Sequence, residues 1–313
     1  MTISDRIKTD GVYIREGGVV KDKYCLVTNA TKDKGLKVTS EIAERIRNAG
    51  HECVVITDID FKGDSAEILR GLEPVDSSCK CCIVLGGDGT LIRTSRVVCE
   101  RSVPVAGINL GMLGFLSAVE RSDIDSAIEN ILSDRYTVED RLLLRAELPG
   151  QNAVKGLLAL NDIVITRSGR SRLISVNIKV NGVKASSFLG DGVIVSTPTG
   201  STGYNLSAGG PIVTPAAKLM MITPICPHSF NSRSIVIGSE DRISLMINAK
   251  DGSAGETAVI TVDGQDVLTM DSDDELLISS YEKPAKLVRF ENTSFFGVLD
   301  RKFGSGDNPT GKG

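Results

Sequence analysis

The sequence predicts an α/β N-terminal domain, Rossmann-like with a mainly parallel sheet, followed by a β-rich C-terminal domain. The first observation is that short apolar runs alternate with helical stretches from Tyr24 to Leu132. Strands that alternate with helices need crossover connections, which place neighbouring strands parallel. The second is that the pattern changes near Arg141 to alternating or apolar runs separated by turns. The third is a pair of strong hairpin signals in this later part, Asn181-Gly182 and Asp263-Gly264.

In the first half, strands are expected at the short apolar runs Tyr24–Thr28, Glu52–Thr57, Cys81–Leu85 and Val103–Ile108. Helices are expected between and after them, at Leu36–Ala49, Ser65–Leu72, Leu91–Glu100 and Ile124–Leu132. The first helix carries Ile42 and Ile46 on one face, and Gly50 follows it as a stop signal. In open parallel sheets, ligands bind at the carboxyl ends of the strands, so the loops there are candidate sites.

In the second half, strands are expected at Leu142–Leu148, Gly156–Thr166, Ile174–Val180 and Gly192–Ser196, with one helical excursion around Ala208–Leu219. The change in pattern places a domain boundary between residues 140 and 141. From Arg301 onward the chain is expected to be an exposed tail. There, Gly306, Gly311 and Lys312 match most of a Walker-type phosphate loop, but no strand precedes them and no helix follows, so we exclude that function.

The composition excludes several classes of protein. A formal net charge of −4 over 313 residues argues against a nucleic-acid-binding surface. The longest apolar runs are far too short to span a membrane, and the polar N-terminus shows no secretory signal. Seven cysteines, an odd number, suit a reducing compartment, so a cytoplasmic location is expected. Cys79, Cys81 and Cys82 cluster, but they lack a partner pair at zinc-site spacing, so we expect them to pack in the core.

The most informative short segment is Gly86-Gly87-Asp88-Gly89-Thr90, between an expected buried strand and an expected helix. Its three glycines let the backbone approach a ligand closely, and successive N–H groups at a helix N-terminus bind anions. A carboxylate there suits a base that takes a proton from an alcohol during phosphoryl transfer. The alternative is a tight turn in which Asp88 only caps the helix, and the segment alone leaves both interpretations open.

A second polar, glycine-rich segment occupies residues 190–210 and crowds small hydroxyl side chains around glycines and a proline. The hydroxyls belong to Ser196, Thr197, Thr199, Ser201, Thr202 and Ser207. Such a turn can wrap a polar ligand, although a long hairpin connection is the alternative. Tyr204 offers a face on which a base could stack, or it closes the loop. Asn161-Asp162 follows an apolar run and either faces a ligand or forms an Asx turn.

Together and in this order, these segments resemble the NAD kinase family from about Tyr24 to about Phe303. The matching motifs are Gly86–Thr90, Asn109–Leu116, Asn161-Asp162, Asp191-Gly192, Ser196–Thr202, Thr223–Ser229 and Val262–Gln265. The Gly-Gly-Asp-Gly-Thr motif alone is shared with lipid kinases, whereas the Ser196–Thr202 and Thr223–Ser229 segments are much more specific. The chain departs mildly from the family, because Gly203 stands where Ala is common and Asp162 where Glu is frequent.

The resemblance implies phosphoryl transfer to the 2′-hydroxyl of the adenosine ribose of NAD, which gives NADP. It implies that Asp88 is the base, that Gly89 lies beside the dinucleotide diphosphate, and that Asn161 and Asp162 hold adenosine or ribose groups of NAD. Asp191 is expected near the nicotinamide half. The adenine side is expected to contact Thr202, Tyr204 and Ser207. The remaining expected binding residues are Gly86, Gly87, Thr90, Thr199, Ser201 and Gly203.

The family also implies a β-rich C-terminal domain, expected at residues 141–284, and a last segment, expected at 285–303, that returns to the N-terminal domain. Its glycines and proline predict that the tail at 304–313 is flexible. It implies a homotetramer or homodimer with shared sites. Because the glycine-rich turn has no Lys or Arg, Mg²⁺ is expected to neutralise the phosphoryl donor, which is ATP or polyphosphate. The metal ligands stay undefined.

Three other functions were weighed. A lipid kinase would need a membrane-docking face, and neither an aromatic cluster nor a basic amphipathic helix is evident. A non-catalytic dinucleotide sensor would have no need of the Asp88 carboxylate. An NAD-dependent dehydrogenase is disfavoured because no Gly-x-Gly-x-x-Gly motif opens a helix with an acidic residue at the expected distance.

Overall fold

The computed structural model describes residues 7–9, 12–15, 18–19, 21–57, 71–111, 114–117, 119–149, 156–168, 173–229, 232–249, 257–272, 274–291 and 294–304. The chain forms two compact units. One contains residues 1–139 and 286–313, and the other contains residues 140–285. Each unit has a hydrophobic core of its own.

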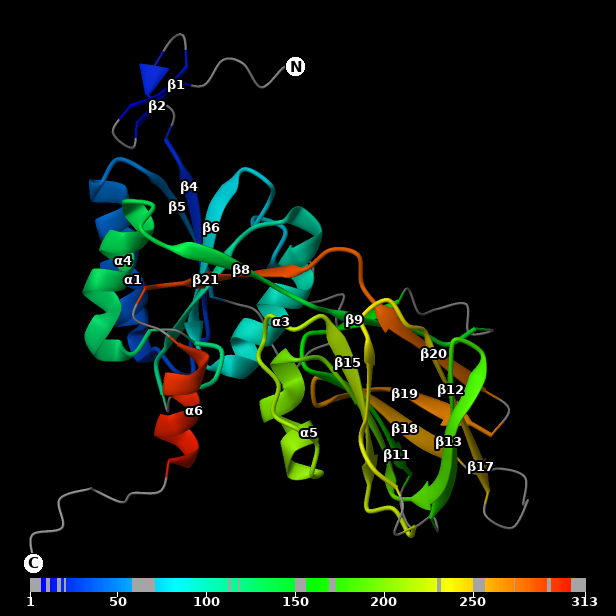
Figure 1. The fold of residues 1–313 in the computed structure, drawn as a ribbon. Coiled ribbons are helices and arrows are strands. Elements are labelled where there is room, and N and C mark those ends of the chain that lie inside the picture. The colour runs from blue at the N-terminus through cyan, green and yellow to red at the C-terminus, as the bar shows by residue number, and fades with distance from the viewer. Residues whose placement is uncertain are drawn as a thin grey trace, which may run out of the picture. The chain divides into compact units, whose positions relative to one another are not determined.

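The N-terminal unit is built on a six-stranded sheet of order β5-β4-β6-β7-β21-β8 (Figure 1). Its strands are β4 (Lys23–Thr28), β5 (Glu52–Ile56), β6 (Cys79–Gly86), β7 (Val105–Asn109), β8 (Thr137–Arg141) and β21 (Ala285–Arg289). Every pairing among β4, β5, β6, β7 and β21 is parallel. A separate small antiparallel sheet contains β1 (Ile7–Thr9), β2 (Val12–Arg15) and β3 (Gly18–Val19).

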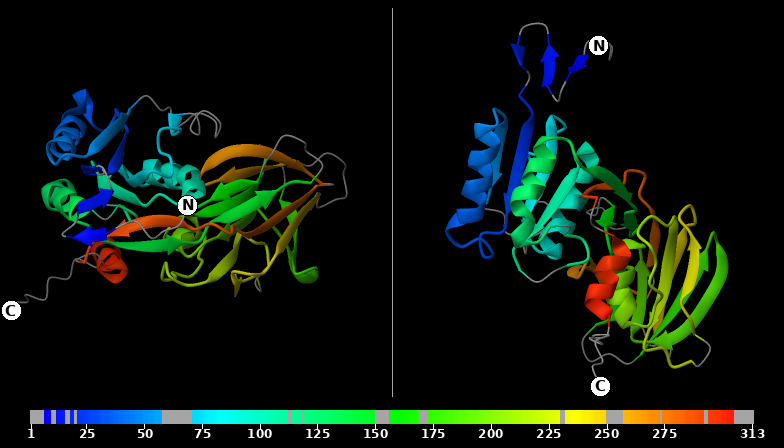
Figure 2. Two further views of the ribbon diagram at one scale, coloured as in Figure 1. Left: turned by 90° about the horizontal axis from the view of Figure 1, so that it is seen from above. Right: turned by 60° about the vertical axis from the view of Figure 1, so that its left-hand side comes forward.

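Helices cover both faces of this sheet (Figures 1 and 2). They are α1 (Lys37–Asn48), α3 (Asp88–Val98) and α4 (Ile124–Leu132), with α6 (Phe295–Phe303) near the C-terminus. The expected apolar face of α1 packs into the core through Ile42 and Ile46, together with Leu26 of β4. Gly50, with φ of 87°, takes the left-handed conformation that ends the turn after α1. The helix α3 lies on the face opposite α1 and α4.

The C-terminal unit is a sandwich of two antiparallel six-stranded sheets. One sheet has the order β10-β9-β20-β17-β12-β13, and the other β16-β15-β14-β11-β18-β19. The first sheet contains β9 (Leu144–Glu147), β10 (Leu157–Ala159), β12 (Ile174–Val180), β13 (Val183–Gly190), β17 (Ile243–Ala249) and β20 (Glu275–Ser280). The second contains β11 (Asp162–Arg167), β14 (Gly192–Ser196), β15 (Leu219–Ile225), β16 (Ile235–Gly238), β18 (Thr257–Val262) and β19 (Gln265–Asp271).

The two sheets bury one face each against the other, because apolar residues alternate along their strands. Ile163 and Ile165 of β11 lie in this common core with Val176 of β12. The intervening Val164 points to the outer face, where it packs with Ile194. A 3-10 turn at Thr199–Thr202 and the short helix α5 (Tyr204–Ser207) follow β14. The predicted fold class is therefore confirmed, with a mainly parallel α/β unit and a β-rich unit.

Two expected elements of the second half are wrong. The run Gly156–Thr166 is two strands in different sheets, because the chain turns at Leu160-Asn161 between β10 and β11. The expected helix at Ala208–Leu219 is instead the single turn α5, which lies earlier in the chain. Gly209 ends it with φ of 84°, and Pro211 cannot continue a helix.

Other expected segments differ only in extent or lie outside the described residues. The expected strand Leu142–Leu148 is shorter, at Leu144–Glu147. Most of the expected helix Ser65–Leu72 lies outside the described residues, and so does the tail at 305–313 with its Walker-like pattern. No helix in the described ranges is long and apolar enough to cross a membrane.

Candidate active site

The glycine-rich turn lies at the carboxyl end of β6. Gly86 is the last residue of that strand, Gly87 precedes the helix with φ of −127°, and Asp88 is its first residue. The helix α3 therefore begins three residues earlier than the expected Leu91. An added Cβ at Gly87 or Gly89 would meet no atom within 4 Å, so the space beside this backbone is open. Gly86 is more confined, since a Cβ there would lie 2.8 Å from Thr90 Oγ1.

The Asp88 carboxylate does not cap its own helix. The N–H groups of Thr90 and Leu91 donate instead to the Gly87 carbonyl, at 3.0 and 3.1 Å, so the capping alternative is wrong. Asp88 Oδ2 accepts from the N–H groups of Phe115 and Leu116, at 2.8 and 3.4 Å. These donors belong to the loop after β7, which ends next to β6 in the sheet.

The same loop reaches the other oxygen of Asp88. Oδ1 accepts from the Ser117 backbone N–H at 3.2 Å and from the Ser117 hydroxyl at 3.0 Å. Ser117 was not among the expected site residues, although it directly follows the Asn109–Leu116 motif. These hydrogen bonds fix the position and orientation of the Asp88 carboxylate at the start of α3.

A lysine from a third loop stands at this edge of the sheet. An ideal Cβ on Gly111 would lie 3.4 Å from Lys32 Nζ. The loop that carries Lys32 packs beside the glycine-rich turn, because Asn29 N–H donates to Leu85 O at 2.9 Å. Among the described residues, no carboxylate pairs with the Lys32 ammonium. Lys32 was not among the expected site residues, because it is 56 residues from Asp88 and belongs to no motif of its own.

In the C-terminal unit, Asn161 and Asp162 occupy the turn between the two sheets, and a third residue organises them. The Asp263 carboxylate accepts from the N–H groups of Leu160, Asn161 and Asp162, at 3.0, 2.8 and 3.1 Å. Asp263 itself lies in the expected hairpin, with φ of 49°. It was quoted as part of a motif but not as a site residue, and its partners lie about a hundred positions away in sequence.

The electrostatics of this turn are unusual. Burial raises the pKa of Asp162 to about 7, and the nearby negative charge of Asp263 adds to the shift. The side chain is only 5% exposed. Next to it, Asn161 Oδ1 is buried and has no hydrogen-bond partner among the described residues. A buried carboxyl with a perturbed pKa beside an unsatisfied amide oxygen is typical of a binding site.

The hydroxyl-rich segment folds around this turn. Thr197 Oγ1 donates to Leu160 O at 2.6 Å and accepts from Gly200 N–H at 3.1 Å. A Cβ on Gly200 would overlap the Asn161 carbonyl, which explains the glycine there. Ser201 Oγ, fully buried, bonds to the backbone of Val213. These hydroxyls stabilise the loop itself.

The expected ligand contacts of this segment differ in accessibility. Thr199 is buried, and its hydroxyl accepts from Arg141 Nη1 at 3.4 Å. Thr202 and Gly203 are half-buried, Tyr204 is 43% exposed, and Ser207 is exposed. A Cβ on Gly203 would lie 3.8 Å from both Asn161 Nδ2 and Asp162 Oδ2, so this glycine borders the turn. The roles of these residues in binding stay predictions.

Asp191 is not brought together with Asp162. Asp162 pairs with Ser196 at one end of β14, whereas Asp191 precedes Gly192 at the other end. The Asp191 carboxylate pairs with Arg167 Nε at 2.8 Å. Tyr204 stands within electrostatic reach of both carboxylates. Burial raises the pKa of its phenol, and the charges of Cys226, Asp191 and Asp162 contribute further.

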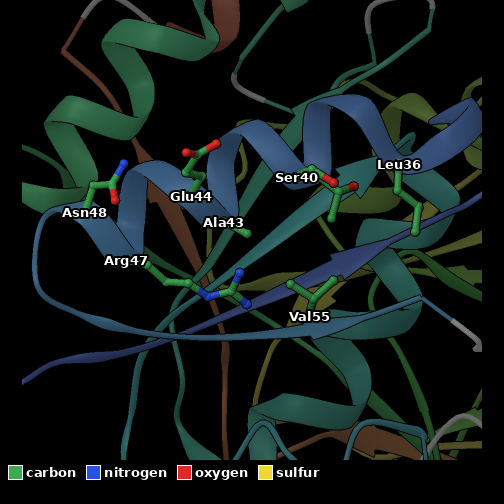
Figure 3. Close-up of a pocket in the computed structure, with 8 residues that line it drawn as sticks. Leu36, Ser40, Ala43, Glu44, Arg47, Asn48 and Val55 are labelled. Atoms are coloured by element: carbon green, nitrogen blue, oxygen red, sulfur yellow. The ribbon is translucent and has the colours of Figure 1, made fainter.

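A separate groove of about 400 Å³ lies between α1 and the edge strand β5 (Figure 3). Leu36, Ala43 and Val55 supply its apolar lining, and Ser40, Glu44 and Arg47 are among its polar residues. None of the residues that line it was expected in a site. The groove is therefore distinct from both glycine-rich segments.

The N-terminal unit holds a carboxylate at a glycine-rich helix start, and the C-terminal unit is a β-sandwich with a polar turn; the first of these features suits a phosphotransferase. Residues 20–136 match the ATP-NAD kinase N-terminal domain, and residues 160–290 match the ATP-NAD kinase C-terminal domain. The chain belongs to the NAD kinase family, as its motifs indicated. The family's general reaction is the formation of NADP.

Relatives cover nearly the whole chain. An NAD kinase of Lachnoclostridium phytofermentans is 41% identical over 285 residues, which are 90% of this chain and 99% of that protein. An NAD kinase of Ruminiclostridium cellulolyticum is 40% identical, with 90% and 97% covered. The crystal structure of an Archaeoglobus fulgidus NAD kinase in complex with ATP has a TM-score of 0.69 at 27% identity, covering 90% of this chain and 98% of that one.

The fold is also similar to that of a solved structure with lower sequence identity. The crystal structure of yeast NADH kinase complexed with NADH has a TM-score of 0.72 at 21% identity, and covers 97% of this chain and 94% of that chain. At this identity the likeness concerns the fold alone.

Proposed function

We propose that this chain transfers a phosphoryl group to the 2′-hydroxyl of the adenosine ribose of NAD, with Asp88 as the base. The observation that carries the proposal is the Asp88 carboxylate, which backbone N–H groups hold at the open start of α3. The carboxylate accepts the hydroxyl proton as the ribose oxygen attacks the terminal phosphorus of the donor. The bond from that phosphorus to the bridging oxygen of the donor breaks, and its electrons leave with ADP or with the shortened polyphosphate.

The donor is proposed to be ATP or polyphosphate, with its phosphates at the carboxyl edge of the N-terminal sheet. Lys32 offers an ammonium there, and the open backbone of Gly87 and Gly89 offers room for close approach. Such a cation lowers the cost of bringing phosphate near a carboxylate. The A. fulgidus relative was crystallised with ATP, which supports ATP as the first donor to test.

Mg²⁺ belongs to the proposal as a companion of the donor phosphates. The described residues contain no group of three or more His, Cys, Asp or Glu side chains able to hold a metal. Mg²⁺ commonly binds through one or two protein carboxylates, substrate phosphates and water. The described residues therefore fit an ion that is held mainly by the donor phosphates better than one held by protein side chains alone. When bound, the ion would neutralise donor charge.

In the C-terminal unit, Asn161 and Asp162 are proposed to hold hydroxyl or amide groups of NAD. The unpartnered Asn161 Oδ1 can accept a hydrogen bond, and Asp162 can accept when ionised. Thr202, Tyr204 and Ser207 are proposed on the adenine side, and Asp191 near the nicotinamide half. Tyr204 has the exposed ring that stacking on a base requires.

Two broader features are also proposed. The family resemblance supports a homodimer or homotetramer, which light scattering after size exclusion would measure. All seven cysteines are free thiols, five of them in strands of the N-terminal sheet, which supports a reducing, cytoplasmic location.

The direct test is NADP formation by the purified chain with NAD, Mg²⁺ and either ATP or polyphosphate. Product in either reaction supports the proposal and identifies the donor. NAD binding without product at any donor would favour a dinucleotide sensor instead.

The role of the base is tested by Asp88→Asn, with Asp123→Asn, an exposed aspartate of the same unit, as the matched control. We expect turnover to fall about 100-fold or more in Asp88→Asn, the range for loss of a general base, while NAD binding persists. The control should keep wild-type turnover. A folded Asp88→Asn variant with normal turnover would rule out the role.

A further inference from the structure

We infer that Ser117 is the positioning residue of the catalytic base, anchoring Asp88 Oδ1 so that Oδ2 takes the proton. The inference rests on the proposed role of Asp88. It concerns which protein groups orient the carboxylate and which of its oxygens reacts.

The two oxygens of the Asp88 carboxylate accept hydrogen bonds from different and unequally close donors. Oδ1 accepts both the backbone N–H and the hydroxyl of Ser117, at 3.2 and 3.0 Å. Oδ2 accepts one short bond from Phe115 at 2.8 Å and one long contact from Leu116 at 3.4 Å. A carboxylate has about four lone-pair positions, and a contact of 3.4 Å is beyond the ordinary range for N–H···O bonds. The position near Leu116 is thus weakly filled and is the one a substrate hydroxyl can take.

The Ser117 hydroxyl is well placed to orient Asp88, because Ser117 is buried and hydrogen bonds hold nearby residues of its loop. Ser117 is only 4% exposed. Arg289 Nη1 of β21 donates to the Leu116 carbonyl at 3.1 Å, and Asn109 N–H donates to Val119 O at 2.9 Å. A buried serine loses little further freedom when it forms a hydrogen bond, so its hydroxyl fixes the carboxylate without a large entropic cost.

Gly114 shows that the loop is shaped around the carboxylate. A Cβ at this position would overlap the Asp88 carboxyl group, the flexible end of a side chain, which would have to move. Only a residue without a side chain lets the backbone come this close. Gly114→Ala is therefore an independent way to displace Asp88 while every Ser117 group remains.

The experiment measures kcat and KM for NAD in four variants. We expect Ser117→Ala to lower kcat about 10-fold, with KM within about twofold, since misplacing a catalytic group acts on the chemical step. Ser117→Thr, which retains the hydroxyl, should recover most of the lost kcat. Gly114→Ala should lower kcat at least as much as Ser117→Ala. Ser126→Ala, an exposed serine on α4, serves as the control and should match the wild type.

The outcomes separate the two proposals. If the wild-type chain forms NADP and folded Ser117→Ala keeps wild-type kcat, or changes KM alone, the inference about Ser117 is overturned and the proposed function stands. A folded Ser117→Thr as slow as Ser117→Ala would also overturn the role of the hydroxyl. If the wild-type chain forms no NADP with any donor, the proposed function itself fails.

Discussion

Replacing Asp162 by Asn should stabilise the protein, and by an amount that depends on pH. The carboxyl is 5% exposed, and its pKa is about 7 in the folded chain, against 3.8 for an ordinary aspartate. Folding therefore opposes ionisation of this group. At pH values between these two, the folded state binds more protons than the unfolded state, so the free energy of unfolding falls as pH rises.

The size of the effect follows from the two pKa values. The contribution of Asp162 is most favourable below about pH 4 and is lost as the pH rises through about 7. Relative to a neutral side chain, ionisable Asp162 costs about 2 kcal/mol at pH 5 and about 4 kcal/mol at pH 8. Asn has nearly the same shape but no charge, so it removes this cost.

Urea unfolding of both proteins, followed by circular dichroism at pH 5 and pH 8, measures the difference. We expect Asp162→Asn to be the more stable protein, with a gap that widens at pH 8. The matched control is Asp271→Asn, an exposed aspartate at the end of β19, which should show no such widening. A difference in the free energy of unfolding that is equal at both pH values, or one that favours the wild type at pH 8, would refute the reasoning. A carboxyl that costs stability at this turn would support the proposed role of Asp162 in binding.

Two further predictions concern stability alone. Lys80 bridges Asp22 and Asp134 at 2.8 and 2.9 Å with all three side chains largely buried, and these bonds outweigh burial and raise the pKa of Lys80. Lys80→Met should leave Asp134 without this lysine and Asp22 with His51, whose Nδ1 lies 3.8 Å from Asp22 Oδ2. We expect the free energy of unfolding to fall by about 2–4 kcal/mol in urea titrations at pH 7, whereas an unchanged midpoint would contradict this. Asn205, fully buried, accepts from the Thr223 hydroxyl at 2.7 Å and donates to a loop carbonyl. Asn205→Ala should lower the free energy of unfolding by about 2–4 kcal/mol, which a lower melting temperature would show. An unchanged melting temperature would contradict this, because it would mean that other groups of the loop satisfy the hydrogen bonds that Asn205 makes.

Local patterns in the sequence were sufficient for the fold class and for most elements of the N-terminal unit. Helix α1 could be predicted because Ile42, Ile46 and Gly50 are close in sequence and report its face and its end. The glycines around Asp88 likewise mark a turn at the end of a strand, wherever that turn lies in the fold. Each of these signals depends on residues within one element, so tertiary structure does not need to be known.

Only the tertiary structure decided what surrounds the candidate catalytic and binding groups. The loop that holds Asp88 follows it by 27 to 29 residues, and Asp263 binds a turn about a hundred residues earlier. The bonds to Asp263 lie at the turn where the run Gly156–Thr166 divides into strands of different sheets. Hydrogen bonds between residues so far apart leave no periodic trace in the sequence, because chain folding alone brings their donors and acceptors together. The sequence determined which residues are candidates for the chemistry, and long-range packing determined their partners, their burial and the raised pKa of Asp162.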